Sequence, residues 1–100
     1  MSTLVLNPAQ RRFLRAQAHA LNPIVLVGDA GLSEAVLKEI GASLKAHELI
    51  KVKVAGDDRA EREQMLETIC RTLGAAPVQH IGKTLVIYRA SDKPKLKLPK

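Results

Sequence analysis

The chain is poor in the large aromatic residues: Phe13 and Tyr88 are the only members of the Phe, Tyr and Trp class in 100 residues. Modules that bind single-stranded RNA on a sheet surface stack bases on two or three aromatic side chains. We expect Phe13 in the core, and Tyr88 either at the edge of the core or as the one ring available for stacking. Any contact with a nucleic acid must therefore rely on charged side chains and main-chain groups.

Cysteine and long apolar runs are also scarce. Cys70 is the single cysteine, so the chain can form no internal disulfide, and we expect a buried, unreactive thiol on an apolar helical face. No apolar run approaches the ~20 residues of a membrane span. The N-terminal segment lacks the pattern of a secretory signal. These features favour a cytoplasmic protein without membrane contact.

The sequence contains no recognisable catalytic constellation. Residues 82–84 (Gly-Lys-Thr) resemble the end of a phosphate-binding P-loop. Pro77, however, stands where that motif needs its first glycine, and a strand rather than a helix follows. The three histidines are not spaced as metal ligands. We therefore expect no enzyme, no cofactor, no metal site and no small-molecule substrate.

Positive charge is what the sequence has in excess. Sixteen lysines and arginines against ten acids give a net charge of +6. The excess lies in residues 1–27, where three arginines have no acidic neighbour, and in the lysine-rich segment 91–100, whereas the middle of the chain is slightly acidic. A basic patch of this kind favours a polyanionic partner, most often a nucleic acid.

Apolar spacing and end signals predict seven elements. Asn7 and Pro8 begin a first helix, whose apolar stripe we place at Ala9, Phe13, Ala16 and Ala20. The continuous run 24–27 is typical of a strand buried on both faces. A second helix follows Ser33, an alternating strand spans 49–54, and a third helix runs from residue 59 to Gly74. Residues 78–81 and 84–88 form a hairpin.

This order, α-β-α-β-α-β-β, predicts the α/β class. Helical crossovers imply parallel pairing among the first strands, and the final hairpin makes a four-stranded mixed sheet. We expect a two-layer sandwich formed by residues 1–90 as a single domain. Residues 91–100 are expected to be a basic, mobile tail.

The turn Gly28-Asp29-Ala30-Gly31 is a candidate phosphate-binding loop. Glycine at both ends lets the main chain approach a ligand and directs N–H groups outward at the start of a helix. A GxxG loop of this size grips nucleotide backbone in one RNA-binding module. The alternative is an ordinary strand-to-helix turn, and the negative charge of Asp29 opposes phosphate contact by that side chain.

Three segments together resemble a known family. Residues 25–33 (VLVGDAGLS), 47–54 (HELIKVKV) and 81–89 (IGKTLVIYR) are similar, in this order, to the YhbY-like CRM (chloroplast RNA splicing and ribosome maturation) domain. The resemblance covers roughly residues 4–90. It implies a fold similar to the C-terminal domain of bacterial translation initiation factor three. It also implies an RNA-binding assembly factor of large-subunit ribosomal precursors, with Gly28 and Gly31 as the backbone clamp.

The candidate RNA contacts are the GxxG loop and seven basic side chains. The basic ones are Lys51, Lys53, Lys83, Arg89, Arg11, Arg12 and Arg15. For the two strand lysines, the alternative is ordinary solvation of a wet strand face. We expect a monomer, and two rival functions stay open: a DNA-coating protein of similar architecture, and an adaptor that docks on an acidic protein surface.

Overall fold

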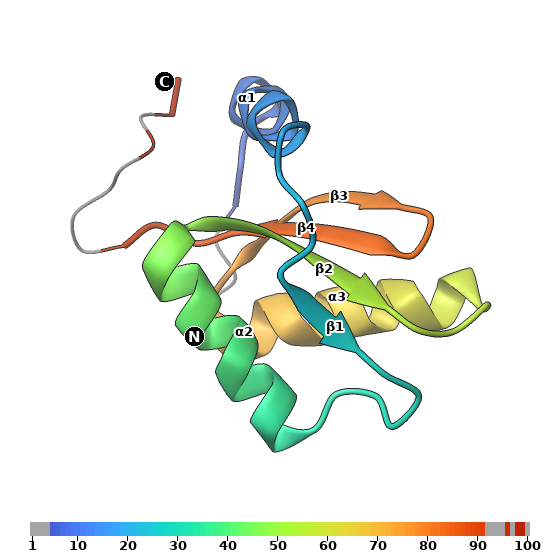
Figure 1. Ribbon diagram of the computed structural model, residues 1–100. Helices are drawn as coiled ribbons and strands as arrows, with labels where there is room; N and C mark the ends of the chain where they lie inside the picture. The colour runs from blue at the N-terminus through green and yellow to red at the C-terminus, as the bar shows by residue number, and fades with distance from the viewer. Residues whose placement is uncertain (1–4, 92–95, 97, 100) are drawn as a thin grey trace.

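The computed structural model describes residues 5–91, 96, 98 and 99, and its seven elements follow the predicted order (Figure 1). They are α1 (Pro8–Ala18), β1 (Val25–Val27), α2 (Glu34–His47), β2 (Leu49–Val54), α3 (Arg59–Leu73), β3 (Ala76–Ile81) and β4 (Thr84–Tyr88). None of the helices within these described residues is long and apolar enough to cross a membrane.

The four strands form one sheet in the order β1-β2-β4-β3. β1 pairs with β2 in parallel, while β2 with β4 and β4 with β3 pair antiparallel. This arrangement confirms the predicted mixed sheet. It also brings three turns to one end of the sheet, because β1 and β2 both finish where the β3–β4 hairpin turns.

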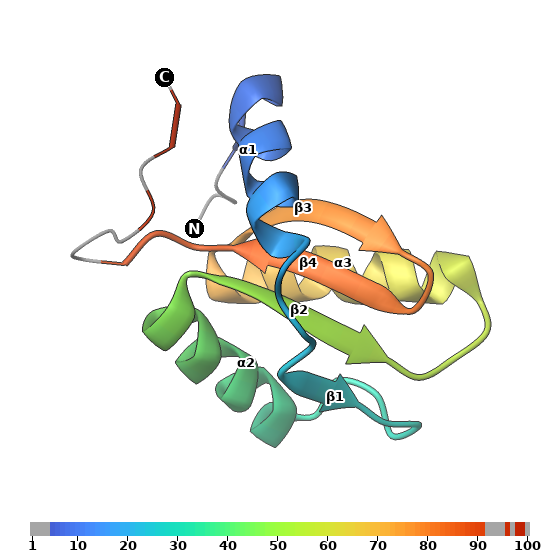
Figure 2. The ribbon, with the colours of Figure 1, turned by 45° about the horizontal axis from the view of Figure 1, so that its top comes forward.

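Helices cover both faces of the sheet. α2 and α3 pack on one face around a core that includes Ile40, Leu44 and Ile69. α1 packs on the other face over Leu49 and Tyr88 (Figures 1 and 2). The expected two-layer packing is therefore present as the sheet with α2 and α3, and α1 adds a partial third layer.

The helix ends follow their sequence signals. Asn7 caps α1 in a capping box with Gln10. Ser33 caps α2, and Asp58 caps α3 by accepting from the N–H of Ala60. Gly74 ends α3 in the left-handed conformation, with φ of 66°, which favours glycine. Local side-chain chemistry thus sets where each helix begins and where α3 ends.

The predicted apolar stripe of α1 is wrong. Leu14 and Ala18 are the buried residues of this helix, whereas Ala9, Ala16 and Ala20 are exposed. Leucine removes more apolar area from water than alanine does, so packing on the sheet rotates α1 to bury Leu14. This rotation decides which arginines lie beside the sheet.

The prediction that the first strand is buried on both faces is also wrong. Val25 and Val27 are buried against α2 and α3, but Leu26 is 70% exposed and the preceding Ile24 is 47% exposed. β1 lies at the edge of the sheet, and α1 covers only the part near the start of β2 and the end of β4. One face of β1 therefore meets solvent.

The chain after β4 returns to the start of β2. The buried carboxylate of Glu48 accepts from the main-chain N–H of Ser91 at 3.1 Å and from that of Leu96 at 3.0 Å. Leu96 and Leu98 pack against the core under α1. Most of the expected mobile tail, residues 92–95, 97 and 100, lies outside the described residues, so its mobility stays a prediction.

Candidate nucleic-acid interface

Among the described residues, α1 is the helix that covers this face of the sheet, and no helix covers the part beyond it (Figure 2). Cross-strand pairing places Leu26 beside Lys53, Lys53 beside Thr84, and Thr84 beside Ile81, in a row across all four strands. The next row carries Lys51, Val86 and Gln79, with Val86 buried beneath α1. We call this surface the open face. Its members are Leu26, Lys51, Lys53, Gln79, Ile81 and Thr84.

Lys51 and Lys53 alternate along β2 as predicted. Ile50, Val52 and Val54 point into the core under α2 and α3, so the lysines between them point to the opposite face. Lys53 is exposed and Lys51 half-buried. Both ammonium groups therefore belong to the open face.

Two arginines of α1 border the same surface. Leu14 and Ala18 face the sheet, and Gln17 lies on the flank that lines a pocket with Leu49. Arg11 and Arg15 are one helical turn apart on the opposite flank. The pocket on the Gln17 flank lies at the start of β2, so the flank of Arg11 and Arg15 is the one nearer the end of β2, where the open face lies. Arg12 is exposed to solvent.

The charge on this surface has one sign. Of the described side chains on the open face and on the adjoining flank of α1, none is acidic. Two lysines and two arginines thus gather on one surface from segments that are about 40 residues apart in sequence. This arrangement suits phosphate binding, because four cations that have no acidic partner among the described residues face one surface.

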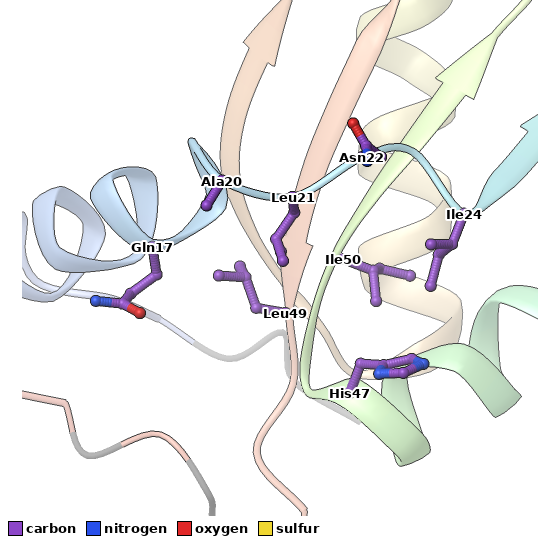
Figure 3. Close-up of a pocket in the computed structure, with 8 residues that line it drawn as sticks. All are labelled: Gln17, Ala20, Leu21, Asn22, Ile24, His47, Leu49 and Ile50. Atoms are coloured by element: carbon purple, nitrogen blue, oxygen red, sulfur yellow. The ribbon is translucent and has the colours of Figure 1, made fainter.

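A pocket lies on the other flank of α1 (Figure 3). It has a volume of about 450 Å³, and Gln17, Leu21, His47 and Leu49 are among its lining residues. None of the described residues lining it is a lysine or arginine. The pocket is therefore separate from the cationic surface.

The GxxG loop is a tight turn directly after β1. The N–H of Gly31 donates to the carbonyl oxygen of Gly28 at 3.0 Å, and Gly31 has φ of 79°. Within the described part of the chain, no partner engages the main-chain N–H groups of Asp29 or Ala30. Ser33 caps α2 as predicted, so the loop ends two residues before that cap and its N–H groups are not those of the helix N-terminus.

The surroundings of this loop differ in charge from the open face. The N–H of Ala55 donates to the carbonyl oxygen of Val27, which places the β2–α3 turn beside the loop. In that turn, Asp57 pairs with Lys83 at 3.1 Å between carboxylate oxygen and Nζ. Lys83 is thus at the hairpin tip as predicted, but it lies against an acid. Such an exposed pair is weak, so a phosphate can compete for the lysine.

Arg89 lies apart from the other candidate side chains. Its guanidinium donates to the carbonyl oxygen of Leu73 at 2.9 Å and to that of Gly41 at 3.2 Å. These carbonyls belong to α3 and α2, on the face opposite to Lys51 and Lys53. The structure therefore uses Arg89 to join the two helices to β4.

Sequence reasoning missed several members of the site. Leu26, Gln79, Ile81 and Thr84 lie on the open face because of strand register, which no local motif reveals. A polar cluster under the hairpin was also missed: the His80 Nδ1 lies 2.6 Å from the Glu63 carboxylate, and Arg62 donates to the carbonyl oxygen of Gly56. The alternation of residues along β3 and β4 was the signal that could have placed Gln79, Ile81 and Thr84 on one face.

Cys70 and the acidic side chains offer no metal site in the described structure. Burial raises the pKa of the Cys70 thiol to about 12, so the thiolate that reacts or binds metal is absent at neutral pH. The described residues contain no group of three or more histidine, cysteine or acidic side chains placed to hold a metal ion. The predicted buried thiol is confirmed.

Comparison with known proteins gives consistent matches. The family model of the CRS1 / YhbY (CRM) domain matches residues 6–89. An RNA-binding protein of Haemophilus influenzae is 50% identical over 95 residues, covering 95% of this chain and 96% of that protein. The probable RNA-binding protein YqeI of Bacillus subtilis is 38% identical over 96 residues, covering 95% of this chain and all (100%) of that one.

A solved structure has the same fold. The solution structure of a hypothetical protein from Staphylococcus aureus, presented as a candidate RNA binder, superposes with a TM-score of 0.85 at 35% identity. It covers 95% of this chain and 100% of that chain. These matches confirm the resemblance read from the three sequence segments. The chain therefore belongs to the CRS1 / YhbY (CRM) domain family.

Proposed function

We propose that this protein binds RNA through the open face and the adjoining arginines of α1, with the GxxG loop at its border. The observation that carries the proposal is the gathering of Lys51, Lys53, Arg11 and Arg15 around a sheet surface without an acidic side chain among its described members. Phosphate contacts supply most of the affinity in such interfaces. The relatives named as RNA-binding proteins support the same function.

We propose that the RNA is precursor ribosomal RNA of the large subunit and that the protein binds it in the cytoplasm. Family membership supports this choice. The test is co-sedimentation of the protein with ribosomal particles on a gradient at low and at high salt. Migration with large-subunit precursors that weakens at high salt supports the proposal, and migration with free protein in both conditions contradicts it.

The salt dependence of RNA binding tests the surface itself. The double variant Lys51→Ala/Lys53→Ala removes two cations from the open face. We expect weaker binding and a log–log salt slope that is flatter by about 1.4 to 1.8, since each phosphate contact contributes about 0.7 on a single strand and about 0.9 on a duplex. The matched control is Lys38→Ala/Lys45→Ala, which removes the same charge from exposed positions of α2. Equal slopes for both double variants would remove the open face from the proposal.

An adaptor that docks on an acidic protein surface is the second candidate, because the same cations would serve it. Ribonuclease treatment separates the two functions. Loss of the association with precursor particles after treatment supports RNA binding. An association that survives favours the adaptor.

A further inference from the structure

The side chains of Phe13 and Tyr88 are partly or fully buried. Tyr88 is 2% exposed and lies in the core under α1, and Phe13 packs partly buried against the same core. Tyr88 is therefore not available for stacking, which settles the alternative left open by the sequence. Single-stranded RNA is usually gripped by rings that stack its bases. The open face offers aliphatic, polar and basic side chains instead.

Uncharged polar groups lie between the basic and aliphatic members of the open face. Thr84 sits between Lys53 and Ile81 in the row across the sheet, and Gln79 sits on β3 beside Val86. Both side chains are half-buried. In the part of the chain that the structure describes, no hydrogen bond engages the Thr84 hydroxyl or the Gln79 amide. Both groups are thus free to bond to a ligand.

The shape of the open face suits one form of nucleic acid. Strands lie about 4.8 Å apart, so the row from Leu26 to Ile81 is roughly 14 Å wide. A surface this broad cannot enter the deep, narrow major groove of an A-form helix. The minor groove of A-form RNA is wide and shallow, and it displays 2′-hydroxyl groups that both donate and accept hydrogen bonds.

We propose that the open face binds the minor groove of an A-form RNA duplex. The Thr84 hydroxyl and the Gln79 amide bond to 2′-hydroxyls, and Leu26 and Ile81 pack against the sugars at the two margins. Lys51, Lys53 and Arg15 contact the flanking phosphates. This inference rests on the proposed RNA binding and names the class of RNA that the open face takes.

Competition among three probes tests the inference. The probes are an RNA hairpin, a DNA hairpin of the same sequence, and an unstructured RNA strand with the same number of phosphates. We expect the RNA hairpin to compete best, because only it presents 2′-hydroxyls in a wide, shallow groove. Equal competition by the single strand or by the DNA hairpin overturns the inference but leaves RNA binding intact. Failure of all three probes to bind overturns the proposed function as well.

A conservative variant tests the role of the hydroxyl. Thr84→Val keeps the shape of the side chain and removes its hydroxyl. We expect it to lower the preference for the RNA hairpin over the DNA hairpin by about two- to tenfold, since one hydrogen bond is lost. The salt slope should stay unchanged, because no charge is removed.

The matched control is Thr68→Val on α3, which lies on the other side of the sheet and is also half-buried. This control should leave the preference as it is in the original protein. If Thr84→Val leaves the RNA-to-DNA preference unchanged while the protein stays folded, Thr84 does not read 2′-hydroxyls and the inference fails.

Discussion

Glu48 is fully buried at the junction of α2 and β2, where it adopts a left-handed φ of 67°. Its carboxylate accepts from the main-chain N–H groups of Ser91 and Leu96. Burial, and then the charge of Glu48, raise the pKa of Tyr88 above its ordinary value. A single carboxylate thus holds the chain after β4 against the start of β2.

A charge placed in the GxxG loop tests whether its main chain meets phosphate. A Cβ at Gly28 would have open space around it, and Gly28 does not have the left-handed φ of Gly31. The variant Gly28→Glu should therefore fold normally and weaken RNA binding, because a carboxylate repels phosphate. Anisotropy titrations measure the affinity, and circular dichroism checks the fold. Ala42→Glu on the exposed side of α2 is the control, and equal affinity for both variants would exclude the loop.

The thiol of Cys70 should be protected by the fold. Because burial raises its pKa to about 12, thiolate is scarce at slightly alkaline pH. We expect a thiol reagent to react more slowly with the folded protein than with the unfolded protein, by a factor on the order of 1,000. Absorbance of the released thiol product, with and without urea, measures this ratio. Fast reaction in the folded state would show that α3 opens locally.

Among the elements, the contact between α2, α3 and β4 depends on one side chain. Arg89 follows β4 and donates to main-chain carbonyls near the end of α3 and in the middle of α2. The carbonyl oxygen of Leu73, at the end of α3, accepts no hydrogen bond within its helix, and the Arg89 guanidinium donates one to it. Arg89 therefore contributes to stability through the helices, although its position in the sequence favours a role in RNA binding.

Replacing Arg89 separates these two roles. Arg89→Gln should lower the free energy of unfolding by about 2 kcal/mol, because hydrogen bonds from a charged donor to half-buried carbonyls are lost. Urea unfolding measures this change, and the salt slope of RNA binding should stay the same. Arg71→Gln, at an exposed position of α3, serves as the control for charge. A flatter salt slope for Arg89→Gln alone would instead place Arg89 at the RNA.

At the scale of the whole molecule, the two faces of the sheet have different roles. The face under α2 and α3 carries the larger core, with Ile50, Val52 and Leu85 among its members. The opposite face is covered by α1 at one end and left open at the other. Because α1 both closes the second core and brings arginines to the open face, stability and the proposed binding depend on the same helix.

Removing residues 91–100 tests whether the end of the chain contributes to the stability of the fold. Leu96 and Leu98 cover the core under α1, and Glu48 loses two main-chain donors without this segment. We expect the truncated protein to lose about 2 kcal/mol of unfolding free energy, since a buried carboxylate loses two main-chain donors. Urea unfolding provides the measurement.

A double-mutant cycle that combines Glu48→Gln with the truncation is the control for this experiment. Glu48→Gln should destabilise the full chain more than the truncated one, because the two changes remove the same contacts. An unfolding midpoint that truncation does not move would support the mobile tail expected from the sequence. Additive effects of the two changes would show that Glu48 acts independently of the segment.

Local spacing alone predicted much of this molecule. The order of the elements, the caps at Asn7 and Ser33, the end of α3 at Gly74, and the alternation of Lys51 and Lys53 with buried residues all follow from the sequence. Each depends on residues within a few positions of one another, where helix and strand periods act directly. The family could also be identified from the sequence, because the three segments that carry the resemblance are short and contiguous.

The composition of the open face was decided only by tertiary structure. Leu26 is exposed because α1 stops short of β1, and Thr84 and Ile81 join Lys53 because of strand register. Arg89 turns away from the lysines because carbonyls of two helices meet it. These outcomes depend on contacts between residues far apart in sequence. No local period encodes them, since the packing of whole elements determines which side chains meet.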